Sequence, residues 1–215
     1  MSKTLVLLSG GQDSTTCLFW AIKEFSSVEA ISFDYGQRHH IELDSAKTIA
    51  KEAGVTQTVL PINTFNALGG NALTDQINVN NKMESNKLPN TFVPGRNLIF
   101  LSFAAAYAYQ KEIRNLIAGM NQTDYSGYPD CRIESINAIQ NAINLAMDYN
   151  ITIHTPLMFK SKAEIWRLSH DIGCIDIVKK YSHSCYNGVK GGCNYCNACI
   201  LREKGFKEFE KSFIP

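Results

Sequence analysis

Charge of one sign is what this 215-residue chain lacks most visibly. Its 21 Lys and Arg residues are balanced by 20 Asp and Glu residues, which leaves a formal net charge of +1. A protein that binds a nucleic-acid backbone usually carries a basic excess. The balanced charge therefore favours a small-molecule partner, and we expect no nucleic-acid partner.

Long hydrophobic runs are also missing. The first apolar run, Leu5 to Leu8, is shorter than the roughly 7–15 residues of a signal-peptide hydrophobic region. The longest run, Leu98 to Tyr109, is broken only by Ser102 and falls short of the roughly 20 residues that a membrane span needs. We therefore predict a cytoplasmic protein that does not contact a membrane.

Internal repeats, linkers and a disulfide-dense composition are absent as well. Apolar residues make up 45% and charged residues 19% of the chain, which is the balance of a globular protein with a sizeable core. We expect one domain over residues 1–215. Within it we expect an α/β core over residues 1–180 and a zinc-binding C-terminal segment over residues 181–215.

What the chain does contain is a regular alternation of short apolar runs and amphipathic helical patterns. The apolar runs predict strands over residues 4–8, 28–33, 56–60, 115–120 and 151–154. The helical patterns predict helices over residues 14–25, 41–53, 98–112, 133–147, 161–172 and about 198–209. This alternation predicts an α/β fold with a doubly wound, mainly parallel, Rossmann-like sheet that binds ligands at the carboxyl ends of its strands.

Two local signals add detail to this prediction. Ser161 and Glu164 have the spacing of a capping box at the start of a helix. Residues 64–90 are rich in Asn, Gly and polar residues and predict an inserted loop.

The segment from Ser9 to Thr16, Ser-Gly-Gly-Gln-Asp-Ser-Thr-Thr, lies between the first predicted strand and the first predicted helix. Its two glycines allow a sharp turn and close approach of the backbone to a ligand. The helix that follows offers unpaired N–H groups and the positive end of its dipole, so the segment predicts an anion site. Asp13 suits either a magnesium ion or a helix cap.

Two better-known phosphate loops are excluded. The segment has no Lys at the position that a Walker loop requires, and the Gly-x-Gly-x-x-Gly dinucleotide fingerprint is absent. The remaining alternative is a plain strand-to-helix turn, which needs only one or two of these residues.

Seven cysteines are present, and four of them, Cys185, Cys193, Cys196 and Cys199, lie within fifteen residues. Four thiolates in a tetrahedron form a closed structural zinc site. An iron–sulfur cluster and free thiols are the alternatives, but a ferredoxin run continues with a further Cys-Pro that is absent here. Zinc is favoured. We interpret the three other cysteines, at positions 17, 131 and 174, as inert small hydrophobic residues and not as nucleophiles.

Several segments together make the chain similar to a known family. They are Leu8-Ser-Gly-Gly-Gln-Asp-Ser-Thr-Thr-Cys17, Tyr35-Gly-Gln-Arg-His39, Thr91-Phe-Val-Pro-Gly-Arg-Asn97, Thr123-Asp-Tyr-Ser-Gly-Tyr-Pro-Asp-Cys-Arg132, His154-Thr-Pro-Leu-Met158 and the cysteine cluster. The chain resembles the 7-cyano-7-deazaguanine synthases of queuosine biosynthesis, within the ATP-pyrophosphatase (PP-loop) superfamily. One departure is Met120-Asn121, where the family has Val-Cys, so no thiol role is carried over to position 121.

The resemblance implies a fold similar to the adenine nucleotide alpha hydrolases and an ATP-dependent carbon–nitrogen ligase. The implied reaction converts 7-carboxy-7-deazaguanine and ammonia to 7-cyano-7-deazaguanine, with release of AMP and diphosphate through adenylated acid and amide intermediates. The implied cofactors are ATP, Mg²⁺ and structural Zn²⁺. We also expect a homodimer.

The resemblance also implies roles for individual residues. The ATP-binding residues are Leu8, Ser9, Gly10, Gly11, Gln12, Asp13, Ser14, Thr15, Thr16, Cys17 and Leu18. The catalytic residues are Asp13, Ser14, Arg96 and Lys162. The substrate-binding residues are Arg38, Asn97, Asp124, Tyr128, Asp130 and Arg132.

Each of these interpretations has a simpler alternative. Asn97 can cap a helix beside a solvated Arg96, and residues 124–132 can form an ordinary turn. Lys162 can be a solvated first-turn lysine. His39 and His40 can shuttle protons, although surface positions are the default for histidine.

Three other functions are compatible with parts of the sequence. A tRNA-modifying ATP-pyrophosphatase uses the same loop on a larger partner, but the chain lacks a basic excess. A zinc-ribbon nucleic-acid module explains the cysteines but leaves the Gly-Gly loop without a role. A nucleotide sensor binds ATP without turnover.

Overall fold

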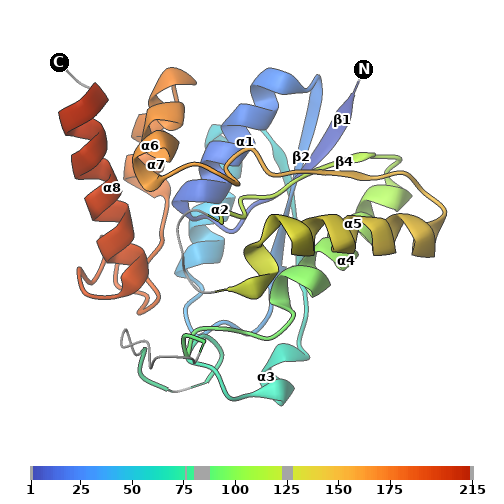
Figure 1. Ribbon diagram of the computed structural model, residues 1–215, viewed down its shortest axis with the longest axis horizontal. Helices are drawn as coiled ribbons and strands as arrows, with labels where there is room; N and C mark the ends of the chain where they lie inside the picture. The colour runs from blue at the N-terminus through green and yellow to red at the C-terminus, as the bar shows by residue number, and fades with distance from the viewer. Residues whose placement is uncertain (1, 76, 80–87, 123–127, 214–215) are drawn as a thin grey trace.

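The computed structural model describes residues 2–75, 77–79, 88–122 and 128–213 (Figure 1). Its centre is one sheet of five parallel strands in the order β3-β2-β1-β4-β5. The strands are β1 (Lys3–Leu7), β2 (Ser27–Asp34), β3 (Thr56–Pro61), β4 (Asn115–Ile117) and β5 (Thr152–His154). The order reverses on the two sides of β1, and a crevice for ligands lies outside the carboxyl ends of the strands at such a point.

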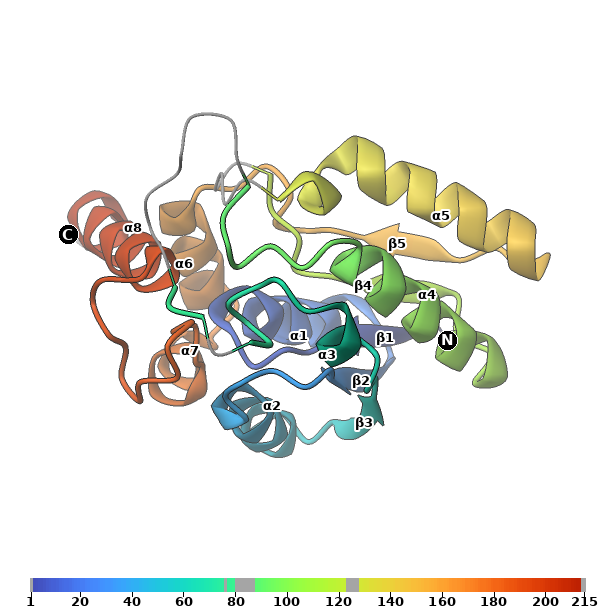
Figure 2. The same cartoon turned by 90° about the horizontal axis from the view of Figure 1, so that it is seen from below.

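Helices cover both faces of this sheet. The larger ones are α1 (Gln12–Glu24), α2 (Ile41–Glu52), α4 (Arg96–Gln110), α5 (Ile133–Met147), α6 (Lys162–Asp171) and α8 (Asn197–Phe213). The short ones are α3 (Phe65–Leu68), α7 (Ile175–Tyr181) and the 3₁₀ turn Pro129–Cys131. Figures 1 and 2 show α4 and α5 on one face and α1 and α2 on the other. The predicted doubly wound α/β fold is confirmed.

The alternation of side chains along β1 explains the two layers. Leu5 is fully buried in the core under α4 and α5, whereas its neighbour Val6 is fully buried in the core under α1 and α2. A central parallel strand is apolar on both faces for this reason, which is why its sequence reads as a continuous apolar run.

The C-terminal segment lies against the same side as α1. Helix α8 packs on α6, where Trp166 and Phe206 meet with ring centroids 4.9 Å apart and Phe209 is fully buried. The capping box at Ser161 and Glu164 is confirmed, since each residue's side chain accepts a hydrogen bond from the other's backbone N–H.

Some predicted boundaries differ from the structure. Helix α1 begins at Gln12, two residues earlier than expected, because the loop turns within the glycine pair. Strand β4 ends at Ile117 instead of residue 120, and helix α7 was not predicted. Helix α7 has only seven residues, too few for a periodic pattern.

The prediction that Asn97 caps α4 is wrong. That helix begins at Arg96, and the residue before it is Gly95, which has a left-handed φ of 71° and provides no side-chain cap. In the part of the chain that the structure describes, no helix combines the length and the apolar character that a membrane crossing requires.

Candidate active site

A cavity of about 340 Å³ opens at the carboxyl ends of β1, β2 and β4. Residues that follow these strands line it, among them Ser9 after β1, Tyr35 after β2 and Gly119 after β4. The C-terminal segment closes another side with residues 183–186 and Arg202. The sheet edge predicted from topology is therefore the edge where the cavity lies.

The loop from Leu8 to Ser14 forms one end of this cavity. Gly10 has a left-handed φ of 89°, and a Cβ atom there would lie 2.3 Å from the backbone oxygen of Glu42 on α2. On the other side, a Cβ atom at Gly119 would lie 3.2 Å from the backbone nitrogen of Ser14. The two glycines let the loop fit closely between α2 and the segment after β4.

Hydroxyl groups organise the loop. The Ser9 N–H donates to Ser14 Oγ over 3.2 Å, and the two hydroxyls lie 3.0 Å apart. The hydroxyl of Thr15 instead donates to the Gly11 carbonyl and that of Thr16 to the Gln12 carbonyl. Ser9 and Ser14 line the cavity, and the Ser14 hydroxyl also lies 3.3 Å from the Gly11 carbonyl as a donor, while Thr15 and Thr16 do not line the cavity.

The predicted ATP-binding residues fall into two groups. Those that line the cavity are Leu8, Ser9, Gly11, Gln12, Asp13 and Ser14. The others, Gly10, Thr15, Thr16, Cys17 and Leu18, lie behind them in the turn or in the core. Burial raises the pKa of Cys17 well above its usual value, which fits the prediction of an inert thiol.

Asp13 and Lys162 form an ion pair across the cavity wall. Lys162 Nζ donates to both carboxylate oxygens of Asp13 over 2.9 Å and 2.7 Å. The alternative of a solvated Lys162 is wrong, because α6 directs this side chain to the loop. The alternative of Asp13 as a helix cap is also wrong, since Gly11 precedes the helix and Asp13 lies in its first turn.

The C-terminal segment supports the loop directly. The His183 N–H donates to the Gly10 carbonyl over 2.8 Å, and the Gln12 N–H approaches Ser184 Oγ at 3.5 Å. Arg202 on α8 donates to the hydroxyls of Ser182 and Ser184 over 2.8 Å and 3.2 Å. The position of residues 182–184 therefore determines one wall of the loop.

The other end of the cavity contains Arg96 among tyrosines. Its guanidinium carbon lies 5.9 Å from the ring centroid of Tyr35 and 6.0 Å from that of Tyr128. Burial lowers the pKa of Arg96, but the hydroxyls of Tyr35, Tyr128 and Tyr186 and the carboxylate of Asp130 outweigh it and raise that pKa. The guanidinium is a fixed positive charge.

The predicted substrate residues are only partly brought together. Arg38 lines the cavity, but it donates to the Ile77 carbonyl over 2.7 Å. The Asn97 N–H donates to Asp130 Oδ2 over 3.1 Å and its amide to Cys131 Sγ over 3.3 Å, which ties α4 to the turn before α5. Arg132 is exposed and outside the cavity lining, and Asp124 lies outside the described residues.

The thiol and the histidines near the cavity also have defined places. Burial and the Asp130 charge raise the pKa of Cys131 to about 11, so it is a neutral thiol. His40 is exposed, as expected for a surface histidine. His39 is not, because its ring lines the cavity and fills the space beside Gly188, where a Cβ atom would lie 2.3 Å from the ring.

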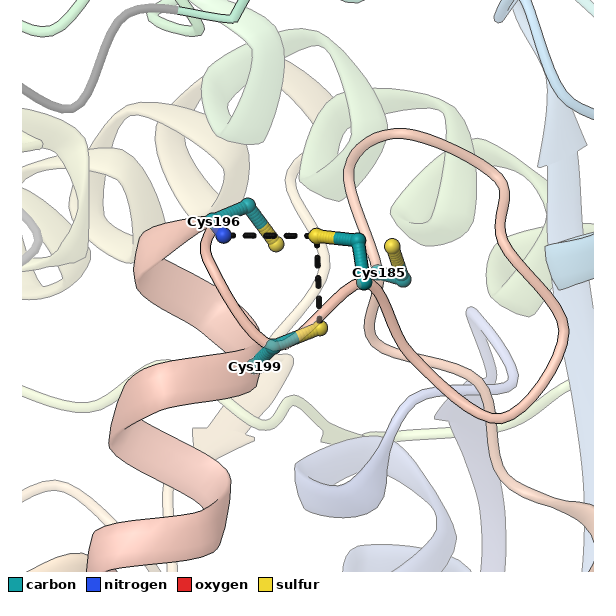
Figure 3. A group of neighbouring side chains, drawn as sticks. Cys185, Cys196 and Cys199 are labelled. Atoms are coloured by element: carbon teal, nitrogen blue, oxygen red, sulfur yellow. Dashed lines mark hydrogen bonds between the residues drawn. The ribbon is translucent and has the colours of Figure 1, made fainter.

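The four clustered cysteines converge before and within the first turn of α8. Their Sγ atoms all lie within 4.8 Å of one another, and Cys193 and Cys199 are 4.0 Å apart. Figure 3 shows the side chains of Cys185, Cys196 and Cys199 gathered at the start of α8. A tetrahedral zinc ion with Zn–S distances of about 2.3 Å separates its sulfurs by about 3.8 Å, so the donor set and spacing fit such an ion.

The thiols of this cluster differ in acidity. Burial raises the pKa of Cys185 and raises that of Cys196 to about 12. Burial also raises the pKa of Cys193, but hydrogen bonds from the Asn187 amide and from backbone N–H groups outweigh it and lower that pKa to about 6. Cys193 is thus the cluster thiol that ionises most readily, and a metal ion binds the thiolate form.

Several cavity residues could not be recognised from the sequence. Tyr35 belonged to a recognised segment but had no assigned role, and Glu42 resembled an ordinary acidic residue in the first turn of a helix. The sequence also did not indicate that the C-terminal segment contributes Ser184, Tyr186 and Arg202 to the cavity, because these residues reach it only when that segment folds back onto the loop.

The fold is similar to that of two solved structures. A 4-thiouridine synthetase, crystallised with RNA and ATP, has a TM-score of 0.57 and 17% identity. The match covers 98% of this chain and 51% of the synthetase chain. NMN synthetase from Francisella tularensis has a TM-score of 0.51 and 16% identity, and the match covers 89% of this chain and 69% of that protein. At these identities the likeness shows the fold alone, and it agrees with the predicted Rossmann-like α/β fold.

The family follows from sequence similarity. The model of the family described as Queuosine biosynthesis protein QueC matches residues 3–210. The 7-cyano-7-deazaguanine synthase of Laribacter hongkongensis is 56% identical over 206 residues, which are 95% of this chain and 90% of that protein. The protein of the same name from Clostridium botulinum is 51% identical over 214 residues, 99% and 98% of the two chains. The chain belongs to the QueC family of queuosine biosynthesis, as the resemblance predicted.

Proposed function

We propose that this chain is an ATP-dependent carbon–nitrogen ligase that makes 7-cyano-7-deazaguanine from 7-carboxy-7-deazaguanine and ammonia. The observation that carries the proposal is a single cavity with two ends, a backbone-rich loop at one end and a cluster of Arg96 with tyrosines at the other. The loop suits a polyphosphate, and the aromatic end suits a planar base. The names of the similar proteins support the same substrate.

The chemistry needs two activations, because neither a carboxylate nor an amide oxygen is a leaving group at neutral pH. The carboxylate attacks the α-phosphorus of ATP, which forms the acyl-adenylate and releases diphosphate. Ammonia displaces AMP and gives the amide with loss of a proton. The amide oxygen then attacks the α-phosphorus of a second ATP and releases a second diphosphate, and loss of AMP and of the two remaining amide protons leaves the nitrile.

The residues contribute positioning and charge to these steps. N–H groups of the loop and the hydroxyls of Ser9 and Ser14 would bind the departing diphosphate. Lys162 and Arg96 would stabilise charge that develops on the phosphates and on the acyl group. Asp13 would hold a magnesium ion, which supplies charge neutralisation when ATP is bound.

The cysteine cluster is a structural zinc site in this proposal. Cys185, Cys193, Cys196 and Cys199 fill all four positions of a tetrahedral ion, so no position is left for substrate. The residues that precede the cluster support the loop through Gly10 and Gln12. Zinc would therefore maintain the wall of the ATP site without entering the reaction.

The remaining expectations belong to the same proposal. The chain acts in the cytoplasm as one domain, with a core over residues 1–180 and a zinc-binding segment over residues 181–215. It acts on small molecules and not on nucleic acid, and it forms a homodimer. Exposed apolar residues on α4, including Leu98, Phe103 and Tyr109, offer a surface for the second copy.

Product analysis tests the function. Incubation with 7-carboxy-7-deazaguanine, ATP, Mg²⁺ and ammonium should give the nitrile together with AMP and diphosphate, two of each per nitrile. Without ammonium, no amide or nitrile should form. Accumulation of ADP and orthophosphate would place the attack at the γ-phosphorus and contradict the mechanism.

A further inference from the structure

The cavity contains one carboxyl group without a partner. Among the described residues that line it, only Asp13 and Glu42 carry carboxyl groups. Asp13 accepts two hydrogen bonds from Lys162, whereas no residue in the described part of the chain donates a hydrogen bond to the Glu42 carboxylate or forms an ion pair with it. Glu42 is half-buried, and a carboxyl group partly withdrawn from water without hydrogen bonds is costly, so its donors should come from a ligand.

The position of Glu42 is fixed by the fold. It lies in the first turn of α2, and its backbone oxygen packs closely against Gly10 of the loop. Burial raises the pKa of the Glu42 carboxyl to about 7, and the charge of Arg96 opposes this increase. The group therefore faces a desolvated space that it shares with Arg96.

The charges of the cavity form two separate groups. Asp13, Lys162 and Arg202 act at the loop, where Asp13 is paired with Lys162 and its charge also acts on Arg202. The charge of Glu42 instead acts on Tyr35 and Tyr186. Burial raises the pKa of each of these tyrosines, and the charge of Glu42 raises it further. The backbone of Glu42 thus lies against the loop, whereas its carboxyl group acts on the aromatic end of the cavity.

The chemistry of a carboxylate selects one kind of ligand edge. Its two oxygens only accept hydrogen bonds, and they match two parallel N–H donors such as those of a guanidinium. A 2-aminopyrimidin-4-one ring presents the same pattern through its ring N–H and its exocyclic amine. Adenine presents an acceptor beside its amine and does not match.

We propose that Glu42 binds the ring N–H and the 2-amino group of the 7-deazaguanine substrate and so determines the choice of base. The inference rests on the proposed function, because it names the residue that reads that substrate. The 7-substituent lies on the far side of the bicyclic ring from the 2-amino group. Binding at Glu42 therefore leaves the reacting carboxylate free to point toward the loop.

The test compares two substrates, 7-carboxy-7-deazaguanine and its analogue without the 2-amino group, and three proteins. The wild type should prefer the 2-amino substrate in kcat/KM by about 100-fold, since a site built for a donor rejects the analogue that lacks it. Glu42→Gln places an amide N–H₂ against the donors of the base. It should lose about 100-fold in kcat/KM on the 2-amino substrate and only a few-fold on the analogue.

The matched control is Asp44→Asn, which removes an exposed carboxylate from the same helix turn. It should leave both kcat/KM values unchanged. The KM for ATP should also stay unchanged in Glu42→Gln, and unfolding midpoints should show that all three proteins are folded.

The possible results distinguish a failure of the Glu42 proposal from a failure of the proposed function. A wild type that makes no nitrile contradicts the proposed function. A wild type that makes nitrile, with a Glu42→Gln variant that keeps its preference or loses equally on both substrates, overturns the role of Glu42 alone. A rise in the KM for ATP instead assigns Glu42 to the nucleotide and also overturns it.

Discussion

The two ends of the cavity are built in different ways. The loop end uses consecutive residues, Ser9 to Ser14, and presents mainly backbone groups. The aromatic end gathers single side chains from separate elements, with Tyr35 after β2, Glu42 on α2 and Arg96 on α4. The end that is built from consecutive residues can be recognised from a short motif, whereas the end that is built from separate elements forms only in the complete fold.

The largest effect is expected where the loop meets its ion pair. Asp13→Ala removes the partner of Lys162 and the predicted magnesium ligand, so nitrile formation should fall by at least about 10³-fold. The rate is measured at saturating ATP and Mg²⁺. Asp171→Asn removes an exposed carboxylate on α6 and should keep the parental rate. A near-normal rate for Asp13→Ala would refute its role.

The close packing of the loop predicts a large loss of stability for Gly10→Ala. The new Cβ atom would meet the Glu42 carbonyl at 2.3 Å in addition to the cost of φ at 89°, so we expect about 3 kcal/mol or more in urea unfolding. Gly54→Ala shares a positive φ of 65° but has nothing within 4 Å. It should cost only about 1–2 kcal/mol. Equal losses would show that close approach to α2 is unimportant.

Loss of the metal tests whether the loop end of the cavity depends only on its own consecutive residues or also on the C-terminal segment. Cys196→Ser should lose the zinc and lower the unfolding midpoint, and the KM for ATP should rise several-fold because residues 183 and 184 support the loop. Elemental analysis should find one zinc per parent chain and one in Cys131→Ser. A brown protein that absorbs near 400 nm, an approximate value for iron–sulfur centres, would contradict zinc.

A smaller effect of pH should come from the aromatic end. The pKa of Glu42 in the folded protein is about 7, above its ordinary value of 4.5, so the folded state holds this proton more tightly than the unfolded state. The protonated Glu42 carboxyl therefore contributes to the stability of the folded state. This contribution is fully present below about pH 4.5 and is lost as the pH rises to about 7. The unfolding midpoint should therefore fall less between pH 5 and pH 8 in Glu42→Gln than in the parent. An identical fall would contradict the burial of this carboxyl group, and Asp44→Asn should match the parent.

The sequence predicted the sheet and the loop well for physical reasons. Buried parallel strands must be apolar on both faces, so runs such as residues 4–8 stand out. The loop needs glycines and hydroxyls at fixed spacing, and the metal cluster needs cysteines close together. Each of these requirements acts over a few neighbouring residues.

The sequence could not predict contacts that join distant segments. Lys162 meets Asp13 across 149 positions, and Arg202 reaches Ser184 only when α8 packs on α6. Glu42 has the sequence pattern of any acidic residue in a first helical turn, and only the fold encloses it beside Arg96. Helix α7 was missed because seven residues carry too little periodicity.

The central claim is that the loop directs attack to the α-phosphorus of ATP in both activations. Both oxygens of the substrate carboxylate should therefore leave as part of AMP, one in each step. With 7-carboxy-7-deazaguanine labelled with oxygen-18 at both positions, mass spectrometry should find two singly labelled AMP molecules per nitrile and no label in diphosphate. Label in diphosphate or orthophosphate would contradict the account.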